Sequence, residues 1–355
     1  MSFESYILDV IEDRKKASGF FFLLSVVSRI YQCGVFIRNA FYDSQIFKSH
    51  HVESCVVSVG NIVVGGTGKT PLIHFLSHAL TPDLPTSIIS RGYRSLIEKS
   101  GVCQQISQGD GPTVRVDQCG DEPFWLASHT QSSVWVGKDK LASAQSACRA
   151  GAKVLFIDDG MQHRRLHRDI EIVLLDGRDP WGKNAFLPKG LLRDSPKRLA
   201  CADLVVVSNV NTLEEWQDIQ KQVQRFTASP IVLMHRSYSM PEGSAFDTVG
   251  IFCGIAKPEA FASAIVSLDM TIVDRLYMED HILPQKEVLQ AFASSCKEKG
   301  AQVLICTEKD WVKILGGLTL DLPVRALQMT LEIREGREAW DACMKKIVSK
   351  GKAFL

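Results

Sequence analysis

Short runs of apolar residues recur along much of the chain, and each ends in polar residues. Such runs lie at residues 55–59, 154–157, 170–175 and 204–207, and stretches with apolar residues at helical spacing separate several of them. Alternation of buried strands with helices predicts a doubly wound, mostly parallel sheet. In sheets of this kind ligands bind beyond the carboxyl ends of the strands, where these polar residues are placed.

A second set of strand and helix patterns begins near residue 230. Apolar runs at 249–253 and 302–306 indicate strands, and a helical pattern covers 284–299. We therefore predict a smaller α/β domain after the main one, and clefts between domains are preferred ligand sites. The predicted divisions are an N-terminal helical segment, a main core and a smaller C-terminal domain, at 1–48, 49–229 and 230–355.

The N-terminal region contains a strongly apolar stretch, residues 17–28, with Lys15 and Lys16 before it and Arg29 after it. About a dozen residues are too few for a helix to cross a hydrocarbon core of ~30 Å. Acidic residues precede the stretch and no small-x-small cleavage site follows it, which argues against a signal peptide. Interleaved apolar and basic residues then continue, which predicts an amphipathic helix in a membrane interface. The alternative is a helix whose apolar face packs on the protein.

Composition and charge argue against a nucleic-acid partner and against a cysteine-bound zinc site. The chain has 355 residues, 45% of them hydrophobic and 23% charged, which is typical of a soluble globular protein large enough for two domains. Its net charge of +1 provides no field that would attract nucleic acid, so we expect no nucleic-acid partner. Its ten cysteines are scattered without any zinc-type spacing, which suits a reducing compartment.

One strand-to-helix junction carries a specific chemical signal. The apolar run at 55–59 leads into a glycine-rich turn and then Lys69 and Thr70, after which apolar residues return at helical spacing. Glycine amides can surround phosphate oxygens because no Cβ blocks the approach, and the helix N-terminus adds partial positive charge. Lys69 can reach the β- and γ-phosphates, and the Thr70 hydroxyl can ligate Mg²⁺. We therefore predict that the chain binds a nucleoside triphosphate.

The standard phosphate-loop spacing has a glycine where this chain has Val63. The alternative interpretation is a glycine-rich turn with an incidental lysine, which the strand before it and the helix after it make less favourable. The predicted nucleotide-binding residues are Val63, Val64, Gly65, Gly66, Thr67, Gly68, Lys69 and Thr70.

Two carboxylates, Asp158 and Asp159, end the apolar run at 154–157, in the form of a Walker B segment. Adjacent strand residues point to opposite faces, so one can hold Mg²⁺ while the other serves a different partner. The alternative is a capped strand end with solvated carboxylates. Gln162 and His163 follow at once, and His163 lies close enough to assist the site, although a histidine amid arginines is also typical of a surface.

Asp121 and Glu122 precede a proline-started helix, where carboxylates commonly cap the N-terminus. The functional alternative is that a carboxylate here accepts a proton from a hydroxyl nucleophile or helps to hold the metal. Arg91, after another strand end, could offset phosphate charge or form a surface ion pair. His281, in the smaller domain, could swing toward the cleft or lie at the surface.

In their order along the chain, these motifs resemble the tetraacyldisaccharide 4'-kinase family. The resemblance extends from the N-terminal apolar helix to at least Lys313, and its most specific part is the phosphate loop together with Asp-Asp-Gly-x-Gln-His. The segments that carry it are 60–62, 65–71, 90–93, 120–123, 158–163, 280–281 and 307–310.

The resemblance implies transfer of the γ-phosphate of ATP to the 4'-hydroxyl of an acylated glucosamine disaccharide 1-phosphate lipid, giving lipid IVA in lipid A biosynthesis. It implies a P-loop NTPase-like lobe with a doubly wound parallel sheet, a second, smaller α/β lobe, and an N-terminal membrane-interface helix. The protein is then peripheral, on the cytoplasmic face of the inner membrane. Mg²⁺ is the implied cofactor and ATP the co-substrate.

The resemblance also implies roles at matching positions. Asp121 and His281 form the acid–base pair that activates the sugar hydroxyl, while Mg²⁺ and Lys69 stabilise the phosphoryl charge. Arg193 is placed to meet a substrate phosphate, although a structural ion pair is equally consistent. The implied metal or transition-state ligands are Thr70, Glu122, Asp158 and Asp159, and the candidate substrate contacts are Arg91, Gln162, His163 and Arg193.

Some positions depart from the family pattern. Val63 replaces a usual threonine and Arg94 a usual glycine. Ile282 replaces the second histidine of a usual Asp-His-His, which leaves His281 alone for the acid–base pair.

Two other functions are alternatives. A membrane-recruited switch ATPase would hydrolyse ATP on dimerisation without a lipid acceptor, but that class commonly carries a lysine where this chain has Val64. A soluble small-metabolite kinase would have no need of the N-terminal helix. Phosphate transfer to a lipid acceptor would distinguish the lipid kinase from the switch.

Overall fold

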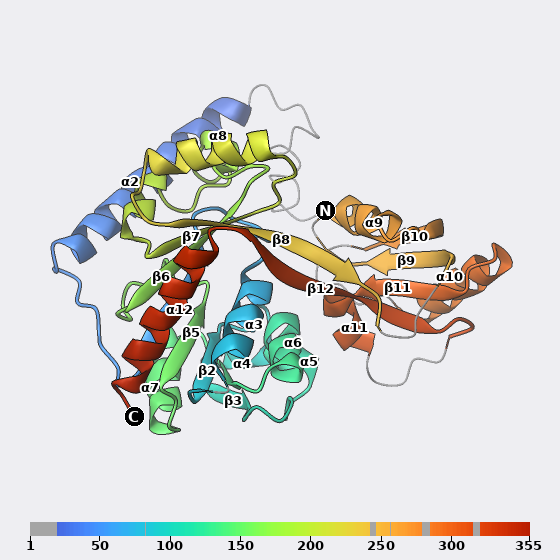
Figure 1. The fold of residues 1–355 in the computed structure, drawn as a ribbon, viewed down its shortest axis with the longest axis horizontal. Helices are drawn as coiled ribbons and strands as arrows, with labels where there is room; N and C mark the ends of the chain where they lie inside the picture. Colours follow the sequence, from blue (N-terminus) through green and yellow to red (C-terminus); the bar gives the residue numbers. More distant parts are fainter. Residues whose placement is uncertain (1–19, 82, 242–245, 256, 279–284, 315–319) are drawn as a thin grey trace. The chain divides into compact units, whose positions relative to one another are not determined.

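A computed structural model describes residues 20–81, 83–241, 246–255, 257–278, 285–314 and 320–355 (Figure 1). The chain forms two compact units that interleave along the sequence. Unit 1 comprises the chain up to Arg91, residues 139–235 and residues 332–355. Unit 2 comprises residues 92–138 and 236–331.

Unit 1 is built on parallel strands in the order β8-β7-β6-β1-β5-β2. Every residue of β1, β5, β6 and β7 is buried, which is why these strands are nearly continuous apolar runs rather than alternating ones. The strand bounds are Ile231–Ser239 (β8), Leu204–Ser208 (β7), Ile170–Asp176 (β6), Cys55–Asn61 (β1), Val154–Asp158 (β5) and Thr86–Ser90 (β2).

Helices cover both faces of these strands. Val205 and Val207 of β7 share an apolar cluster with Trp216 and Ile219 of α8. Successive strand residues point to opposite faces, so each strand needs a helical cover on both sides. Helix α12 also contacts β1 and β7, and α3 contacts β1, β2 and β5. The predicted doubly wound parallel sheet is confirmed. The helices of unit 1 are Phe20–Asp43 (α2), Lys69–Leu80 (α3), Lys140–Arg149 (α7), Leu213–Gln224 (α8) and Arg337–Lys352 (α12), with 3₁₀ turns at Gly182–Asn184 and Pro196–Cys201.

Unit 2 contains parallel strands in the order β10-β9-β11-β12 and an antiparallel pair, β3 with β4. Its strands are Thr271–Tyr277 (β10), Thr248–Cys253 (β9), Val303–Thr307 (β11), Val324–Glu335 (β12), Gln104–Ser107 (β3) and Ser133–Val136 (β4). Its helices are Leu96–Ser100 (α4), Val116–Cys119 (α5), Asp121–His129 (α6), Pro258–Val266 (α9), Lys286–Glu298 (α10) and Glu308–Ile314 (α11). Within this unit α11 packs against α6.

The units differ from the predicted division at 49–229 and 230–355. The chain leaves unit 1 within β8 and returns to it within β12, so the last helix belongs with the first strands. A Cβ at Gly351 of α12 would lie only 2.7 Å from Val154 of β5, which shows how closely this helix approaches the strands. Local patterns identify elements, whereas contacts between remote segments decide which elements share a core.

Helix α2 has a buried face and an exposed face. One face packs on unit 1, where Leu24, Ser28, Val35 and Asn39 are buried and the Ser28 hydroxyl donates to the carbonyl of Phe186 at 2.7 Å.

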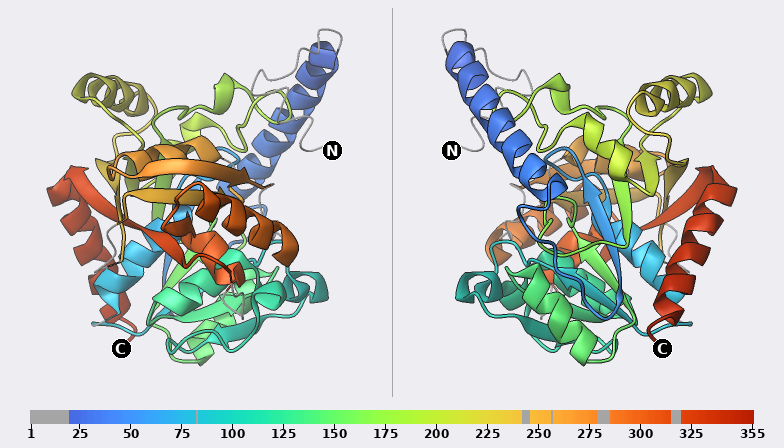
Figure 2. Two further views of the ribbon diagram at one scale, coloured as in Figure 1. Left: turned by 90° about the vertical axis from the view of Figure 1, so that its right-hand side faces the viewer. Right: turned by 90° about the vertical axis from the view of Figure 1, so that its left-hand side faces the viewer.

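The other face of α2, the long blue helix of Figure 2, carries exposed large apolar side chains. The most exposed are Phe22 at 79%, Phe36 at 73% and Ile30 at 67%. Within the described part of the chain, every helix is too short or too polar to cross a membrane. One face of α2 thus packs on the protein, as the alternative interpretation expects, and the other exposes apolar side chains, for which contact with a membrane stays a prediction.

Candidate active site

The glycine-rich loop joins β1 to α3 in unit 1. Gly65 and Gly68 have φ angles of 115° and 100°, in the left-handed region that favours glycine. A Cβ built on Gly65 or Gly66 would meet no described atom within 4 Å, so open space lies beside these residues. Gly68 is the N-cap of α3 and, among the described side chains, none caps it. The first amides of the helix are thus available for an anionic ligand.

Asn61, the last residue of β1, binds across the loop to a residue near its other end. Its Nδ2 donates to Thr67 Oγ1 at 3.0 Å, and the Thr67 amide donates to the Gly65 carbonyl at 3.1 Å. Asn61 and Thr67 are both buried. The curvature of the loop is therefore fixed by the protein itself.

Val63 and Val64 form the wall of the loop. The Val64 amide already donates to the Leu191 carbonyl at 2.8 Å, and Val63 forms a β-bridge with Leu192. The Val63 side chain is buried in the apolar cluster that also contains Leu192 and Phe186. An apolar residue can stand at position 63 because this position belongs to the core. The structure therefore leaves Gly65 to Thr70 as the candidate phosphate cradle.

The Walker B segment turns sharply at the end of β5. Asp158 is buried and accepts a hydrogen bond from Ser90 Oγ at 3.2 Å, and Asp159 has a left-handed φ of 51°. The buried Lys140 donates from Nζ to the carbonyl oxygens of both aspartates, at 2.8 Å for Asp159. Burial lowers the pKa of Lys140 to about 8. The turn that presents the two carboxylates is thus held by a lysine that sequence reasoning missed.

Asp159 is held by two cations. Arg193 reaches both of its carboxylate oxygens, at 2.8 and 2.6 Å, and also donates to Asn61 Oδ1. Lys69 Nζ lies 3.5 Å from Asp159 Oδ1. Burial alone would raise the pKa of Asp159, but the hydrogen bonds from Arg193 and the charge of Lys69 hold that pKa well below its usual range. The structural ion pair considered for Arg193 is therefore observed.

Three of the other predicted substrate contacts also belong to unit 1. Gln162 Nε2 donates to the Asn61 carbonyl at 2.9 Å, which ties the segment after β5 to the end of β1. Burial, together with the charge of Lys140, lowers the pKa of His163 to about 4, so the imidazole is neutral at pH 7. Arg91 is exposed at the end of β2.

The candidate acid–base residues belong to unit 2. Asp121 is the first residue of α6, and Glu122 beside it is exposed. Lys313 Nζ of α11 lies 3.5 Å from Asp121 Oδ2 and 3.0 Å from Asp310 Oδ1. Sequence reasoning assigned no role to Lys313, and the available signal was its i,i+3 spacing from Asp310. His281 lies outside the described residues.

Glu308 begins α11 in a partly buried position. It accepts a hydrogen bond from the Met329 amide at 3.3 Å. Burial outweighs this bond and raises the pKa of Glu308 to about 7.

Some of the predicted metal ligands suit Mg²⁺ by their chemistry. Among the described residues no three or more His, Cys, Asp or Glu side chains gather into a metal cage. Mg²⁺ in kinases is usually held by one or two protein oxygens, substrate phosphates and water instead. The Thr70 hydroxyl at the start of α3 and the Asp158 carboxylate at the end of the neighbouring strand β5 fit that role. The carboxylate of Asp159 already pairs with Arg193 and Lys69. Glu122, the remaining predicted metal ligand, belongs to unit 2.

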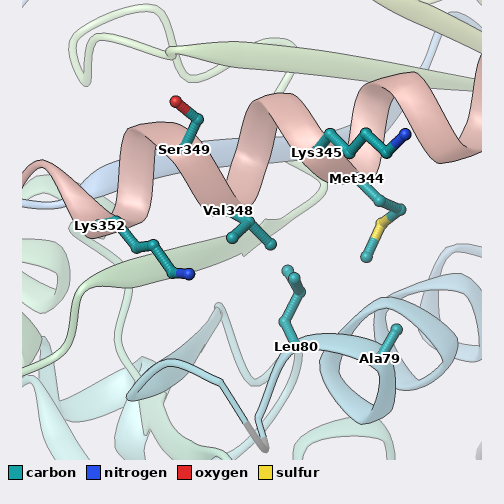
Figure 3. A pocket seen from close by; sticks show the side chains of 7 residues that line it. All are labelled: Ala79, Leu80, Met344, Lys345, Val348, Ser349 and Lys352. Carbon is teal, nitrogen blue, oxygen red and sulfur yellow. The ribbon is translucent and has the colours of Figure 1, made fainter.

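A separate surface pocket of ≈ 480 Å³ lies between the C-terminal end of α3 and α12 (Figure 3). The phosphate loop is at the opposite end of α3, which has 12 residues and is therefore about 18 Å long. This pocket is distinct from the candidate site. Its lining residues are Ala79, Leu80, Met344, Lys345, Val348, Ser349 and Lys352.

Comparison with known proteins gives the same assignment as the motifs. The family model described as tetraacyldisaccharide-1-P 4'-kinase matches residues 20–349. A tetraacyldisaccharide 4'-kinase of Chlamydia trachomatis is 36% identical over 86% of this chain and 84% of its own length. A protein of the same name from Syntrophus aciditrophicus is 34% identical over 90% of this chain and 91% of its own length.

The fold is similar to that of a solved protein. The structure of LpxK from Aquifex aeolicus in complex with ATP aligns with a TM-score of 0.72 and 27% sequence identity, covering 91% of this chain and 97% of the other. The resemblance inferred from the motifs is thus confirmed over nearly the whole described chain. This chain belongs to the tetraacyldisaccharide-1-P 4'-kinase family.

Proposed function

We propose that this protein transfers the γ-phosphate of ATP to the 4'-hydroxyl of tetraacyldisaccharide 1-phosphate, forming lipid IVA. The observation that carries the proposal is the preformed glycine-rich loop with Lys69 beside the Asp158–Asp159 turn, in a chain of this kinase family. Phosphoryl transfer depends mainly on positioning and on stabilisation of charge, and unit 1 supplies both.

The phosphate cradle acts through backbone amides and Lys69. The loop amides from Gly65 to Thr70 other than that of Thr67, which donates to the Gly65 carbonyl, receive the phosphate oxygens together with the N-terminus of α3, because both present partial positive charge. Lys69 lies at 3.5 Å from Asp159, which is a loose ion pair, so its ammonium can turn to the β- and γ-phosphates when ATP binds. Arg193 then keeps Asp159 neutralised and in place.

Thr70 and Asp158 would hold Mg²⁺, which supplies electrostatic stabilisation of the charge on the β- and γ-phosphates. Of the two aspartates, Asp158 is the better candidate. Both oxygens of Asp159 are occupied by the Arg193 fork, whereas Asp158 accepts a hydrogen bond from the neutral hydroxyl of Ser90.

Asp121, with His281, is the proposed acceptor of the proton from the 4'-hydroxyl. The sugar oxygen forms a bond to the γ-phosphorus as the bond from that phosphorus to the β-phosphate oxygen breaks, and ADP leaves. The hydroxyl proton passes to the Asp121–His281 pair.

The exposed face of α2 is the proposed site of membrane contact. An acylated disaccharide stays in the bilayer because each buried CH₂ contributes about 0.8 kcal/mol. A kinase of this substrate therefore has to work at the lipid surface. Phe22, Ile30 and Phe36 present apolar area that can enter the headgroup region on the cytoplasmic face of the inner membrane.

The decisive experiment measures transfer of labelled phosphate from ATP to tetraacyldisaccharide 1-phosphate in mixed micelles. Wild type and Lys69→Ala are compared with Lys221→Ala, a matched control that removes an exposed lysine from α8 of the same unit. We expect acceptor-dependent transfer in wild type and in the control, and its loss in Lys69→Ala. Hydrolysis of ATP without labelled lipid would contradict the proposal and favour a switch ATPase.

A further inference from the structure

Within unit 2, one buried lysine connects α11 to the first residue of α6. Lys313 Nζ lies 3.5 Å from Asp121 Oδ2 and 3.0 Å from Asp310 Oδ1. The Lys313 side chain is 4% exposed and that of Asp310 is 2% exposed. Lys313 is therefore a buried cation placed between two carboxylates.

Asp310 has neutral hydrogen-bond donors of its own. Its Oδ2 accepts from the Thr307 hydroxyl at 2.7 Å and from the Gly254 amide at 3.0 Å. The Thr307 hydroxyl in turn accepts from the Asp310 amide at 3.1 Å, which forms a local cap at the start of α11. Asp310 is thus anchored to the protein at one oxygen and presents the other to Lys313.

Desolvation limits how much this arrangement contributes to stability. Burying an ion pair costs desolvation that its attraction often does no more than offset, so such a pair is weak evidence of a structural need. A buried ammonium anchored by Asp310 at one side has a restricted position. The carboxylate it meets at the other side, Asp121, is restricted in turn.

We propose that Lys313 is a positioning residue for the kinase reaction, which fixes the direction of the Asp121 carboxylate through its contact with Oδ2. Asp310 anchors Lys313, and Thr307 with the Gly254 amide anchors Asp310. The inference rests on the proposed role of Asp121 as proton acceptor. A carboxylate held in one direction meets the acceptor hydroxyl without first losing rotational freedom.

The test uses Lys313→Met together with Asp310→Asn. Lys313→Met alone leaves a buried carboxylate without its cation, which can prevent folding. In the double variant the pair is neutral, and the side-chain oxygen of the introduced asparagine still accepts from Thr307 and Gly254. A midpoint of thermal unfolding close to that of wild type is the expected result. Lys297→Met, which removes an exposed lysine from α10 of the same unit, is the matched control.

In the micelle assay we expect the double variant to lose about 10- to 100-fold in kcat, with KM for ATP and for the lipid changed less than about twofold. Lys313→Arg, which retains the charge, should recover part of kcat. The control should match wild type. A loss in kcat without a loss of stability is the result that a purely structural role of Lys313 would not give.

Two outcomes overturn the inference. A folded double variant with the kcat of wild type would show that Asp121 needs no positioning by Lys313. A double variant that fails to fold would show that the lysine is a structural requirement. Asp121→Ala is measured alongside: near-normal turnover in that variant would remove the proposed role of Asp121 itself, which is a different failure from that of Lys313.

Discussion

Arg193 forks over Asp159, with its two guanidinium nitrogens 2.8 and 2.6 Å from the two carboxylate oxygens. The pair joins the Walker B turn to the segment that lines the phosphate loop, where the Arg193 amide donates to the Ile62 carbonyl at 2.8 Å. Residues from three distant parts of the chain are thereby held around Lys69. This pair organises the candidate site through contacts within the protein.

Replacing Arg193 should impair catalysis more than folding. Arg193→Lys removes the planar guanidinium that binds both oxygens of Asp159. The Asp159 carboxylate then pairs mainly with Lys69 and competes with the ATP phosphates for the Lys69 ammonium. We expect kcat/KM for ATP to fall about 10- to 100-fold, as for the loss of a charged hydrogen bond worth about 1.5–3 kcal/mol. Steady-state kinetics test this.

The control for Arg193 is Arg165→Lys. Arg165 forms an exposed pair with Asp139 at 3.0 Å, and exposed pairs contribute little. Equal kinetics for Arg193→Lys and Arg165→Lys would contradict the role given to the fork.

Lys140 should contribute to stability through the two carbonyl groups it satisfies. Lys140→Met removes the donor to the carbonyl oxygens of Asp158 and Asp159 in a buried position. The free energy of unfolding should fall by about 1–3 kcal/mol. Urea denaturation of this variant and of Lys138→Met, which changes an exposed neighbour, measures the difference. A fall of the same size in both variants would mean that the buried hydrogen bonds are unimportant.

Glu308 should make stability depend on pH. Its pKa is raised from 4.5 to about 7 by burial, so the folded state favours the protonated form. The resulting stabilisation is fully present below pH 4.5 and is lost as the pH rises to about 7. The full shift corresponds to roughly 3 kcal/mol.

The measurement for Glu308 is urea denaturation of wild type and Glu308→Gln at several pH values between about 4.5 and 7.5. The amide does not titrate, so the variant should lose this part of the pH dependence while other groups contribute equally to both proteins. Identical pH profiles would show that Glu308 is ionised normally in the folded state.

The exposed face of α2 should govern binding to lipid. Changing Phe22, Ile30 and Phe36 to Ala removes apolar area while helix propensity is kept. If each side chain contributes about 1 kcal/mol on burial, partition onto anionic vesicles should weaken by about 100-fold. Flotation with vesicles measures this, and Leu213→Ala, exposed on α8, is the control. Unchanged partition in the triple variant would assign this face another role.

Asp121 and His281 should act as one unit. Asp121→Ala and His281→Ala should each lower kcat strongly while ATP binding persists, and the double variant should lose little more than either single variant. Single-turnover assays with calorimetric binding of ATP separate the two effects. Multiplicative losses in the double variant would mean that the two residues act independently.

The sequence by itself determined the local structures. Strand, glycine-rich turn and helix at residues 55–80 were predicted from apolar periodicity and glycine content, and β1 and α3 are found there. Asp158 at the end of β5 and Asp121 at the start of α6 were located in the same way. Each depends on a spacing of a few residues, which a sequence states directly.

Only the tertiary structure decided which remote residues meet. The hydrogen bond from the Val64 amide to the Leu191 carbonyl holds one side of the loop in place. Arg193 binds Asp159, which lies 34 positions earlier in the chain. Lys140 has no sequence pattern of its own, and Lys313 has only its i,i+3 spacing from Asp310. A lysine becomes a buried hydrogen-bond donor only where folding surrounds it with oxygen atoms. Periodicity encodes which face of an element is buried, whereas the partner on that face depends on packing among segments that are distant along the chain.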